Sequence, residues 1–313
     1  ENILDAFSKG NSLMVPPTRW VLKGLVEDPH AKALGDLSER YDEDNRVPSL
    51  EILDGITLLP VRSVTLPPAS RTNAIFLGDE DSAKLLIDPS PNSEEEYRRL
   101  LTTIQDSVPD AIFLTHHHPD HHQLSNRLAR ELRIPIILSQ DTLQRLTAKF
   151  GQQYFENIEL QTVSENQQVT CWHGSAVRVY EIPGHDSGHL GLAPDSMAWF
   201  LVGDLIQGIG TVVIPSPEGD MATYFNTLKK VISLSPEVII PSHGIPMRTT
   251  HRLEETLKHR LQRESQILKL HRSGKSKQEI LMELYSETDH RLHPAAMQNI
   301  ESHLAKLRKE NIL

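Results

Sequence analysis

Residues 111–122 read AIFLTHHHPDHH, a continuous apolar run followed by five histidines within seven residues. The apolar half is typical of a β-strand that is buried on both faces. His116 and His118 are two residues apart, so after a strand end their side chains can point the same way. The stretch therefore predicts a buried strand that carries metal-binding side chains at its end.

The turn after the strand adds two further candidate ligands. Pro119 restricts the backbone, and Asp120 with His121 is then expected at the start of a helix. Four potential ligands thus converge within six residues. Imidazole nitrogens and carboxylate oxygens are the usual donors for Zn²⁺ in open, catalytic sites, and iron and manganese can use similar sets.

Three single residues farther along the chain each follow a predicted strand: His185, Asp204 and His243. Functional groups of layered α/β folds gather on such loops, because rigid neighbours hold them. Taken alone, each would more often be an ordinary loop residue, and a histidine run can be a solvated loop or a purification tag. A tag lies at a terminus, however, whereas residues 116–122 lie in mid-chain behind a buried strand.

Around these ligands the chain alternates between strand and helix patterns up to about residue 247. We expect strands at 56–66, 73–78, 83–90, 111–115, 134–138, 158–163, 176–182, 197–203 and 237–242. Helices are expected at 93–105, 141–150 and 219–234, and Asp141 is the expected N-cap of the second. A further helix is expected where Leu124, Leu128 and Leu132 repeat every four residues. This mixed order predicts a layered α/β body over residues 51–247.

The two ends of the chain differ from that body. Residues 1–50 are expected to form an extension packed on it, with a turn at 15–20 and short helices at 19–28 and 32–44. Residues 248–313 are wholly helical in pattern and predict a small C-terminal domain. The first ten residues resemble no leader, and trimming upstream of Glu1 is an open alternative.

The 313-residue composition, 38% hydrophobic and 24% charged, is that of an ordinary globular protein. No run of about 18 apolar residues exists, so we expect no membrane-spanning helix. The one cysteine, Cys171, excludes an internal disulfide and favours a cytoplasmic location. The net charge is −10, but residues 248–277 hold nine Lys or Arg against three Glu, which keeps an anionic substrate open.

The motifs HHHPDH, GHDSGH, GD after an apolar strand, and SHG together resemble the metallo-β-lactamase superfamily over residues 55–247. The resemblance implies an αββα sandwich with the site at one edge of its two sheets. It implies that His116, His118 and His185 bind a first metal. It implies that Asp120, His121 and His243 bind a second metal and that Asp204 bridges both. Two Zn²⁺ per chain are expected, with Fe or Mn as alternatives.

Such a pair of cations acidifies a shared water, so the expected nucleophile is a metal-bridging hydroxide. Asp120 is the candidate catalytic residue that orients it and shuttles protons. The chain departs from the family's usual pattern at Asp186, commonly Thr, and after His121, where a Gly-rich stretch is common. His118 stands where redox-active di-iron members need Glu.

Within residues 198–313, four motifs resemble a subgroup of lactamase-beta-like proteins: GDLIQGIGTVVI, GDMATYFNTLKKVISL, VIIPSHG and HRLQRESQIL. The subgroup is typified by an endoribonuclease that cleaves single-stranded RNA. The C-terminal stretch LHPAAMQNIESHLAKLRKENIL resembles that subgroup's winged-helix-like domain, which we expect to pack or to form a homodimer. Basic residues of 249–272 could neutralise RNA phosphates: Arg252, Lys258, Arg260, Arg263, Lys269 and Arg272. No aromatic residues interleave with them to stack bases, which weakens this hypothesis.

Two further hypotheses stay open. One is hydrolysis of small thioesters, lactones or esters, as in the glyoxalase II branch. The other is a mononuclear-iron sulfur dioxygenase. Among the other histidines, His189 is a candidate hydrogen-bond partner of the site, and His117 and His122 are expected beside the ligands or in solvent. The rest, including His303, are expected at the surface.

Overall fold

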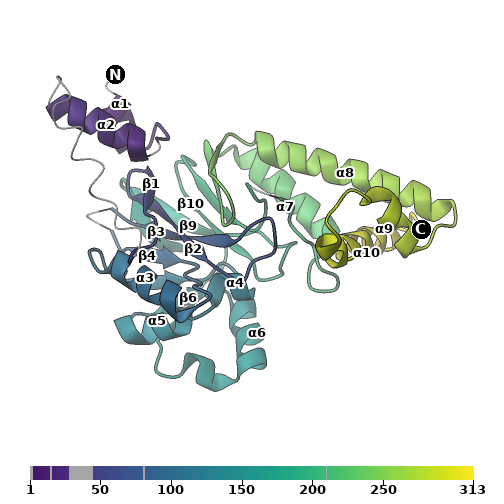
Figure 1. Cartoon of the computed structure of the whole chain (residues 1–313), viewed down its shortest axis with the longest axis horizontal. Helices are drawn as coiled ribbons and strands as arrows, with labels where there is room; N and C mark the ends of the chain where they lie inside the picture. The colour runs from purple at the N-terminus through teal and green to yellow at the C-terminus, as the bar shows by residue number, and fades with distance from the viewer. Residues whose placement is uncertain (1–2, 15, 28–44, 80–81, 209) are drawn as a thin grey trace. The chain divides into compact units, whose positions relative to one another are not determined.

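The computed structural model describes residues 3–14, 16–27, 45–79, 82–208 and 210–313 (Figure 1). The chain forms two compact units. The first unit comprises residues 1–66, 70–179 and 193–198, and the second comprises 67–69, 180–192 and 199–313. Within the described ranges, every helix is too short or too polar to span a bilayer.

The first unit contains a seven-stranded sheet whose strands lie in chain order. They are β1 (Leu50–Leu53), β2 (Ile56–Arg62), β3 (Arg71–Leu77), β4 (Leu85–Ile87), β5 (Ala111–Phe113), β6 (Ile136–Leu138) and β7 (Leu160–Thr162). Strands β1 to β4 pair antiparallel and β4 to β7 pair parallel. β2 ends four residues before the predicted end, and Val64 and Leu66 beyond it are exposed. Pro67 and Pro68, which follow, have no N–H for a ladder.

Helices cover this sheet through one apolar core. They are α3 (Glu94–Ile104), α4 (Pro119–His122), α5 (Ser125–Leu132) and α6 (Gln140–Phe150), followed by the 3₁₀ turn η2 (Gln152–Phe155). Leu124 is left-handed with φ 60°, so the predicted helix begins one residue later, although Leu124 still packs on the core. Ser139, not Asp141, caps α6, since its hydroxyl accepts from Thr142 N.

The N-terminal segment of the first unit forms α1 (Ile3–Ser8) and α2 (Pro16–Glu27). The predicted turn at 15–20 is wrong for its described residues, because Pro16 and Pro17 occupy the first helical turn, where a missing N–H costs nothing. Arg19 of α2 forms an ion pair with Glu51 of β1. The predicted helix at 32–44 lies outside the described residues.

The second sheet has six strands in the order β13-β12-β11-β10-β9-β8. These are β8 (Gln168–Trp172), β9 (Ser175–Glu181), β10 (Leu190–Pro194), β11 (Phe200–Gly203), β12 (Val238–Pro241) and β13 (Met247–Arg248). The sequence patterns did not predict β8, whose five residues mix polar and apolar side chains, or β10, which contains Gly and Pro. The predicted α/β fold with two sheets and C-terminal helices is confirmed.

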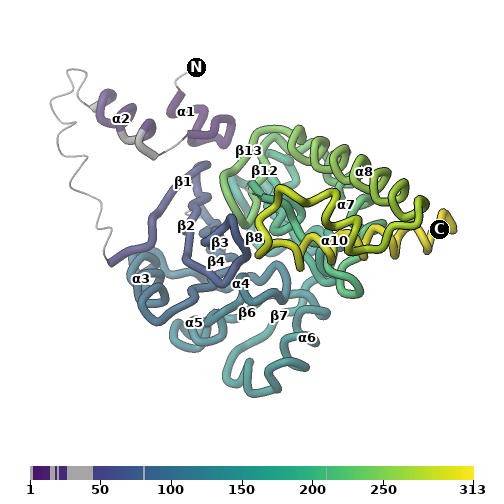
Figure 2. Tube along the Cα trace, turned by 45° about the vertical axis from the view of Figure 1, so that its right-hand side comes forward, coloured from purple at the N-terminus to yellow at the C-terminus, as the bar shows by residue number. Residues whose placement is uncertain are grey.

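Helices dominate the second unit: α7 (Met221–Leu234), α8 (His251–Arg272), α9 (Lys277–Leu284) and α10 (His293–Lys309), with the 3₁₀ turn η3 (His290–Leu292). Figure 2 shows α7, α8 and α10 side by side, and all three pairs are in contact. The surface prediction for His303 is wrong: it is fully buried on α10, with Nδ1 3.0 Å from Glu264 Oε2. The carboxylate gives the buried Nδ1 a hydrogen-bond partner.

Candidate metal centre

Four of the predicted ligands lie together in the first unit, in the turn after β5 and in α4. This loop group consists of His116, His118, Asp120 and His121. His116 Nε2 is 3.0 Å from His118 Nδ1. Two nitrogens that each lie about 2.0 Å from a tetrahedral zinc are roughly 3.3 Å apart. The spacing of these two nitrogens therefore fits two ligands of one ion.

Asp88, at the end of β4, holds the loop group in place. Its buried carboxylate accepts hydrogen bonds from Thr115 N at 2.8 Å and Thr115 Oγ1 at 2.6 Å. The same carboxylate lies 2.8 Å from His121 Nδ1, and Thr115 Oγ1 lies 3.0 Å from His116 Nδ1. With Nδ1 of both imidazoles engaged, Nε2 is the nitrogen that each presents as a ligand.

Asp88 was not among the predicted site residues. The sequence feature that could have identified it is its position, as an acidic residue directly after the apolar run Leu85–Ile87. Because β4 and β5 pair in parallel, their carboxyl ends meet at the same sheet edge. An acid after one strand therefore lies beside histidines after the other.

Asp120, the candidate catalytic residue, is held through its main chain. Its carbonyl accepts hydrogen bonds from the hydroxyls of Thr72, at 2.8 Å, and Ser90. Its side chain is 16% exposed, with Oδ1 3.8 Å from His121 Nε2. The carboxylate can therefore reach both a ligand nitrogen and solvent.

His122, by contrast, is a packing residue. It is buried, its Nδ1 lies 2.7 Å from Tyr154 Oη, and its ring contacts Phe150 edge to face. Burial lowers the pKa of His122 to about 4, which keeps the ring neutral. The alternative that His122 faces solvent is wrong, whereas His117 is partly exposed.

The other three predicted ligands lie together in the second unit. This strand-end group consists of His185, Asp204 and His243. Asp204 is central, with one carboxylate oxygen 3.8 Å from His185 Nε2 and the other 3.4 Å from His243 Nε2. All three side chains are at least nine-tenths buried. An aspartate between two imidazoles is the arrangement that a bridging carboxylate needs.

Close backbone packing fixes the position of His185. Gly184 has φ 133°, and a Cβ there would lie 2.4 Å from Tyr224 Cα on α7. Asp220 N donates to the Gly184 carbonyl at 3.0 Å. Nδ1 of His185 lies 2.7 Å from the carbonyl of Val213, so Nε2 is turned toward Asp204.

Asp204 follows β11 through a glycine in the left-handed region. Gly203 has φ 53°, and a Cβ there would lie 2.3 Å from His189 Nε2. That same nitrogen accepts a hydrogen bond from Asp204 N at 3.3 Å. The predicted role of His189 as a hydrogen-bond partner of the site is thus confirmed.

The donor set suits a first-row metal. Each group offers imidazole nitrogens together with a carboxylate, the combination that zinc, iron and manganese accept. The one thiol is not part of either group: Cys171 lies on β8, half-buried, with Sγ 3.1 Å from Gln168 Nε2. The residues present therefore fit divalent metal ions.

Residues 67–243 match the metallo-β-lactamase superfamily, and residues 276–312 match the β-lactamase-associated winged helix domain. The chain is 30% identical over 259 residues to the β-lactamase-like protein 2 homolog of Drosophila melanogaster, which covers 77% of this chain and 84% of that protein. It is 31% identical over 135 residues to a hydroxyacylglutathione hydrolase of Wigglesworthia glossinidia brevipalpis, over 42% of this chain and 46% of that enzyme.

Solved structures share the fold. A β-lactamase domain protein from Burkholderia ambifaria aligns with a TM-score of 0.69 at 20% identity, over 88% of this chain and 91% of that one. A metallo-β-lactamase family protein from Thermus thermophilus aligns with a TM-score of 0.65 at 21% identity, over 83% of this chain and 95% of that one.

Proposed function

Because the chain belongs to the metallo-β-lactamase superfamily and is a hydrolase of that fold, we propose that the loop group and the strand-end group close into one dinuclear zinc centre. The observation that carries the proposal is the way the ligand atoms are oriented within each group. Each presents Nε2 atoms and a carboxylate oxygen together, while partners on the protein side engage Nδ1 of His116, His121 and His185. Family membership supports placing them around the same ions.

In this proposal His116, His118 and His185 would hold one ion, and Asp120, His121 and His243 would hold the other. Asp204, which lies between His185 and His243, would be a ligand of both. Two divalent cations would supply Lewis acidity and acidify a water molecule near neutral pH.

The protein's own groups then orient and move protons. The Asp120 carboxylate, partly exposed beside His121, accepts a proton from the attacking water and later returns it to the leaving group. Asp88 keeps His121 and the turn at Thr115 from rotating away while charge develops. The reaction class is hydrolysis at an electrophilic carbonyl or phosphoryl centre.

We propose a small thioester or ester as the substrate. The observation that favours this class is the hydroxyacylglutathione hydrolase relative, together with the state of the basic residues on α8. Arg260 is buried and donates to Val212 O, and Arg263 donates to Leu284 O at 3.0 Å. Arg272 donates to Ile312 O at 3.0 Å. Three of the six basic side chains thus donate to main-chain carbonyls of the protein itself, and of these Arg272 is also exposed to solvent.

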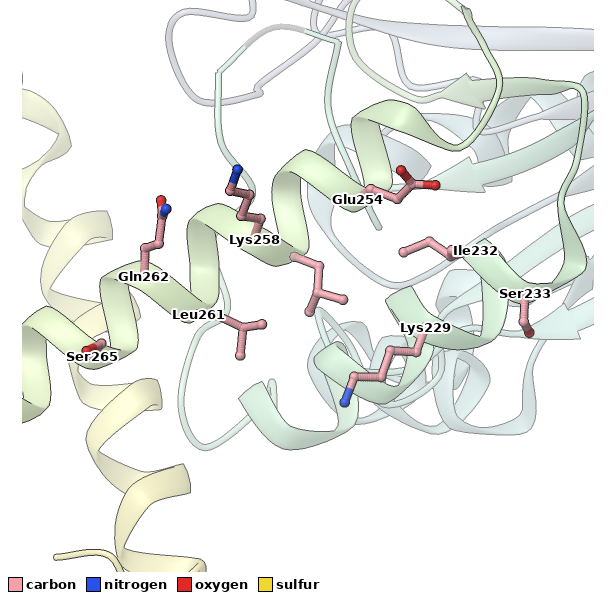
Figure 3. Close-up of a pocket in the computed structure, with 9 residues that line it drawn as sticks. Lys229, Ile232, Ser233, Glu254, Lys258, Leu261, Gln262 and Ser265 are labelled. Carbon is pink, nitrogen blue, oxygen red and sulfur yellow. The ribbon is translucent and has the colours of Figure 1, made fainter.

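Single-stranded RNA is the second candidate. It is favoured by the winged helix domain and by exposed Lys258 and Lys269 on α8. Lys258 lines an open groove between α7 and α8, of about 730 Å³, together with Lys229. Figure 3 shows apolar Leu261 and Ile232 in this groove. No aromatic ring lines it among the described residues, so bases would have no stacking surface there.

The test is metal content followed by turnover of one preparation against thioester, lactone, β-lactam and RNA substrates. Two zinc equivalents per chain are expected, whereas a single iron would reject the dinuclear centre in favour of a mononuclear-iron sulfur dioxygenase. Lys258→Glu with Lys269→Glu is the matched control: it should leave thioester turnover unchanged. A loss of RNA cleavage in that variant, with no thioester turnover in the wild type, would reverse the substrate choice.

A further inference from the structure

The tripeptide Val212–Ile214 in the second unit is held at each of its three residues by a different partner. Arg260 of α8 donates to the Val212 carbonyl. The Val213 carbonyl is the partner of His185 Nδ1 at 2.7 Å. Ile214 N donates to Asn299 Oδ1 of α10 at 2.9 Å. The contact to a predicted metal ligand is therefore flanked on both sides by contacts to the C-terminal helices.

These flanking contacts are buried, so water does not substitute for them. Arg260 is 2% exposed and Asn299 is 6% exposed, and Val212 and Ile214 are buried as well. The Arg260 guanidinium also lies 5.7 Å from the Tyr224 ring centroid. A buried charge aimed at a backbone carbonyl fixes that peptide group strongly.

The position of the Val213 carbonyl determines how His185 meets a metal. A carbonyl accepts but cannot donate, so His185 carries its proton on Nδ1 and presents the lone pair of Nε2. If the peptide units on either side of Val213 rotated, this carbonyl would move and the imidazole would lose its fixed tautomer and direction. Partners of this kind are known to tune metal affinity without touching the ion.

We propose that Arg260 and Asn299 are positioning residues for His185, through which the C-terminal helices control the metal affinity of the site. The metal-affinity part of this inference rests on the proposed function. Asn299 lies within the winged helix match at 276–312, so one task of that domain is to complete the metal centre.

The test compares zinc affinity in Asn299→Leu and Arg260→Met with the wild type, by competition with a chromophoric chelator. Affinity for one of the two zinc equivalents should fall about 10- to 100-fold. Asn299→Asp keeps the Oδ1 acceptor and should restore affinity close to that of the wild type. The full chain is used throughout, and thermal unfolding shows whether each variant is folded.

Arg263→Met is the matched control. Arg263 lies one turn along α8, also donates to a main-chain carbonyl, and stacks on Tyr285 at 4.6 Å, but its carbonyl belongs to Leu284 of α9. We expect it to lower stability and to leave zinc affinity unchanged. An equal loss of affinity in Arg263→Met would overturn the proposal, because the effect would then be one of general stability.

A second measurement needs no metal. Nitrogen-15 NMR of the His185 ring in the metal-free protein should show a proton fixed on Nδ1 in the wild type, and exchange of that proton between Nδ1 and Nε2 in Asn299→Leu. The signal is assigned by its loss in His185→Gln. Wild-type protein that binds fewer than two zincs would contradict the proposed function alone. An unchanged tautomer in folded Asn299→Leu would overturn the present inference alone.

Discussion

The loop group and the strand-end group supply the same kinds of atoms by different means. In the loop group, four ligands lie within six consecutive residues, and a strand end and a short helix set their spacing. In the strand-end group, three ligands come from segments about twenty to forty residues apart in the chain. Their spacing depends on glycines, on a hydrogen-bonded loop and on helices packed behind it.

This difference predicts that substitutions near the two groups will have different effects on metal binding and turnover. A change near the loop group alters chemistry or one contact, because the local chain already holds the rest. A change behind the strand-end group moves ligands that nothing local can restore. Four experiments distinguish changes near the loop group from changes behind the strand-end group.

The largest effect is expected when the two aspartates are exchanged for asparagine. Asp120→Asn should lower turnover about 10²- to 10⁴-fold, because the amide cannot take up a proton, and it should lose less zinc than Asp204→Asn, because Asp120 is a proposed ligand of one ion only. Asp204→Asn should lose zinc as well as turnover, since its carboxylate lies between His185 and His243. Elemental analysis and steady-state kinetics on both variants measure this, and equal zinc content in the two would contradict it.

The next effect concerns the support of the loop group. Asp88→Ala removes the acceptor shared by Thr115 and His121, so zinc affinity should fall about 10- to 100-fold. Asp110→Ala is the control, because Asp110 accepts only from Lys84 N at the other end of β5. Chelator competition should show no change in that variant. Unaltered affinity in Asp88→Ala would mean that the turn holds His121 without help.

A smaller effect is expected from Gly184→Ala behind the strand-end group. The new methyl would overlap Tyr224 and shift His185, lowering the free energy of unfolding by about 1–3 kcal/mol and weakening zinc binding. Gly274→Ala is the control, because Gly274 also has a positive φ, 85°, but a Cβ there would meet no atom within 4 Å. This control variant should lose stability through backbone strain alone, and its zinc affinity should equal that of the wild type. Urea denaturation and chelator competition compare the pair, and identical results for both would exclude the proposed overlap.

The smallest effect is a pH dependence in the helices that support the strand-end group. Burial lowers the pKa of His303, with the adjacent Glu264 opposing the shift. The unfolded chain therefore binds a proton more readily, and the free energy of unfolding should fall as the pH drops through about 6.5. His303→Gln should reduce that fall. Urea denaturation at about pH 7.5 and 5.5 measures it, and an equal fall in both proteins would contradict the assignment to His303.

The same contrast explains what could be predicted from the sequence. The loop group followed from spacing alone, because the strand end and Pro119 act over a few residues. The strand-end group was predicted from the order of motifs and their resemblance to a family. Asp88 and the Val213 carbonyl were not predicted, because each acquires its role from partners at least 27 residues away.

The errors have a similar cause. His303 was assigned to the surface because its partner Glu264 lies 39 residues earlier, on another helix. Strand β10 was not predicted because its Gly, Ala and Pro have weak β-propensity and it depends on neighbouring strands. Strand β8 was not predicted although Val169, Thr170 and Trp172 favour a strand. Long-range pairing, rather than local pattern, decides such segments.

The two hydroxyls that bind the carbonyl of Asp120 have a practical consequence. Thr72 and Ser90 secure the backbone at this position without using the side chain. The backbone at position 120 is therefore held independently of its side chain, so another residue can be introduced there without changing the main-chain path. A redesigned enzyme with a thiol, an amide or a second imidazole at this point could be compared directly with the natural one.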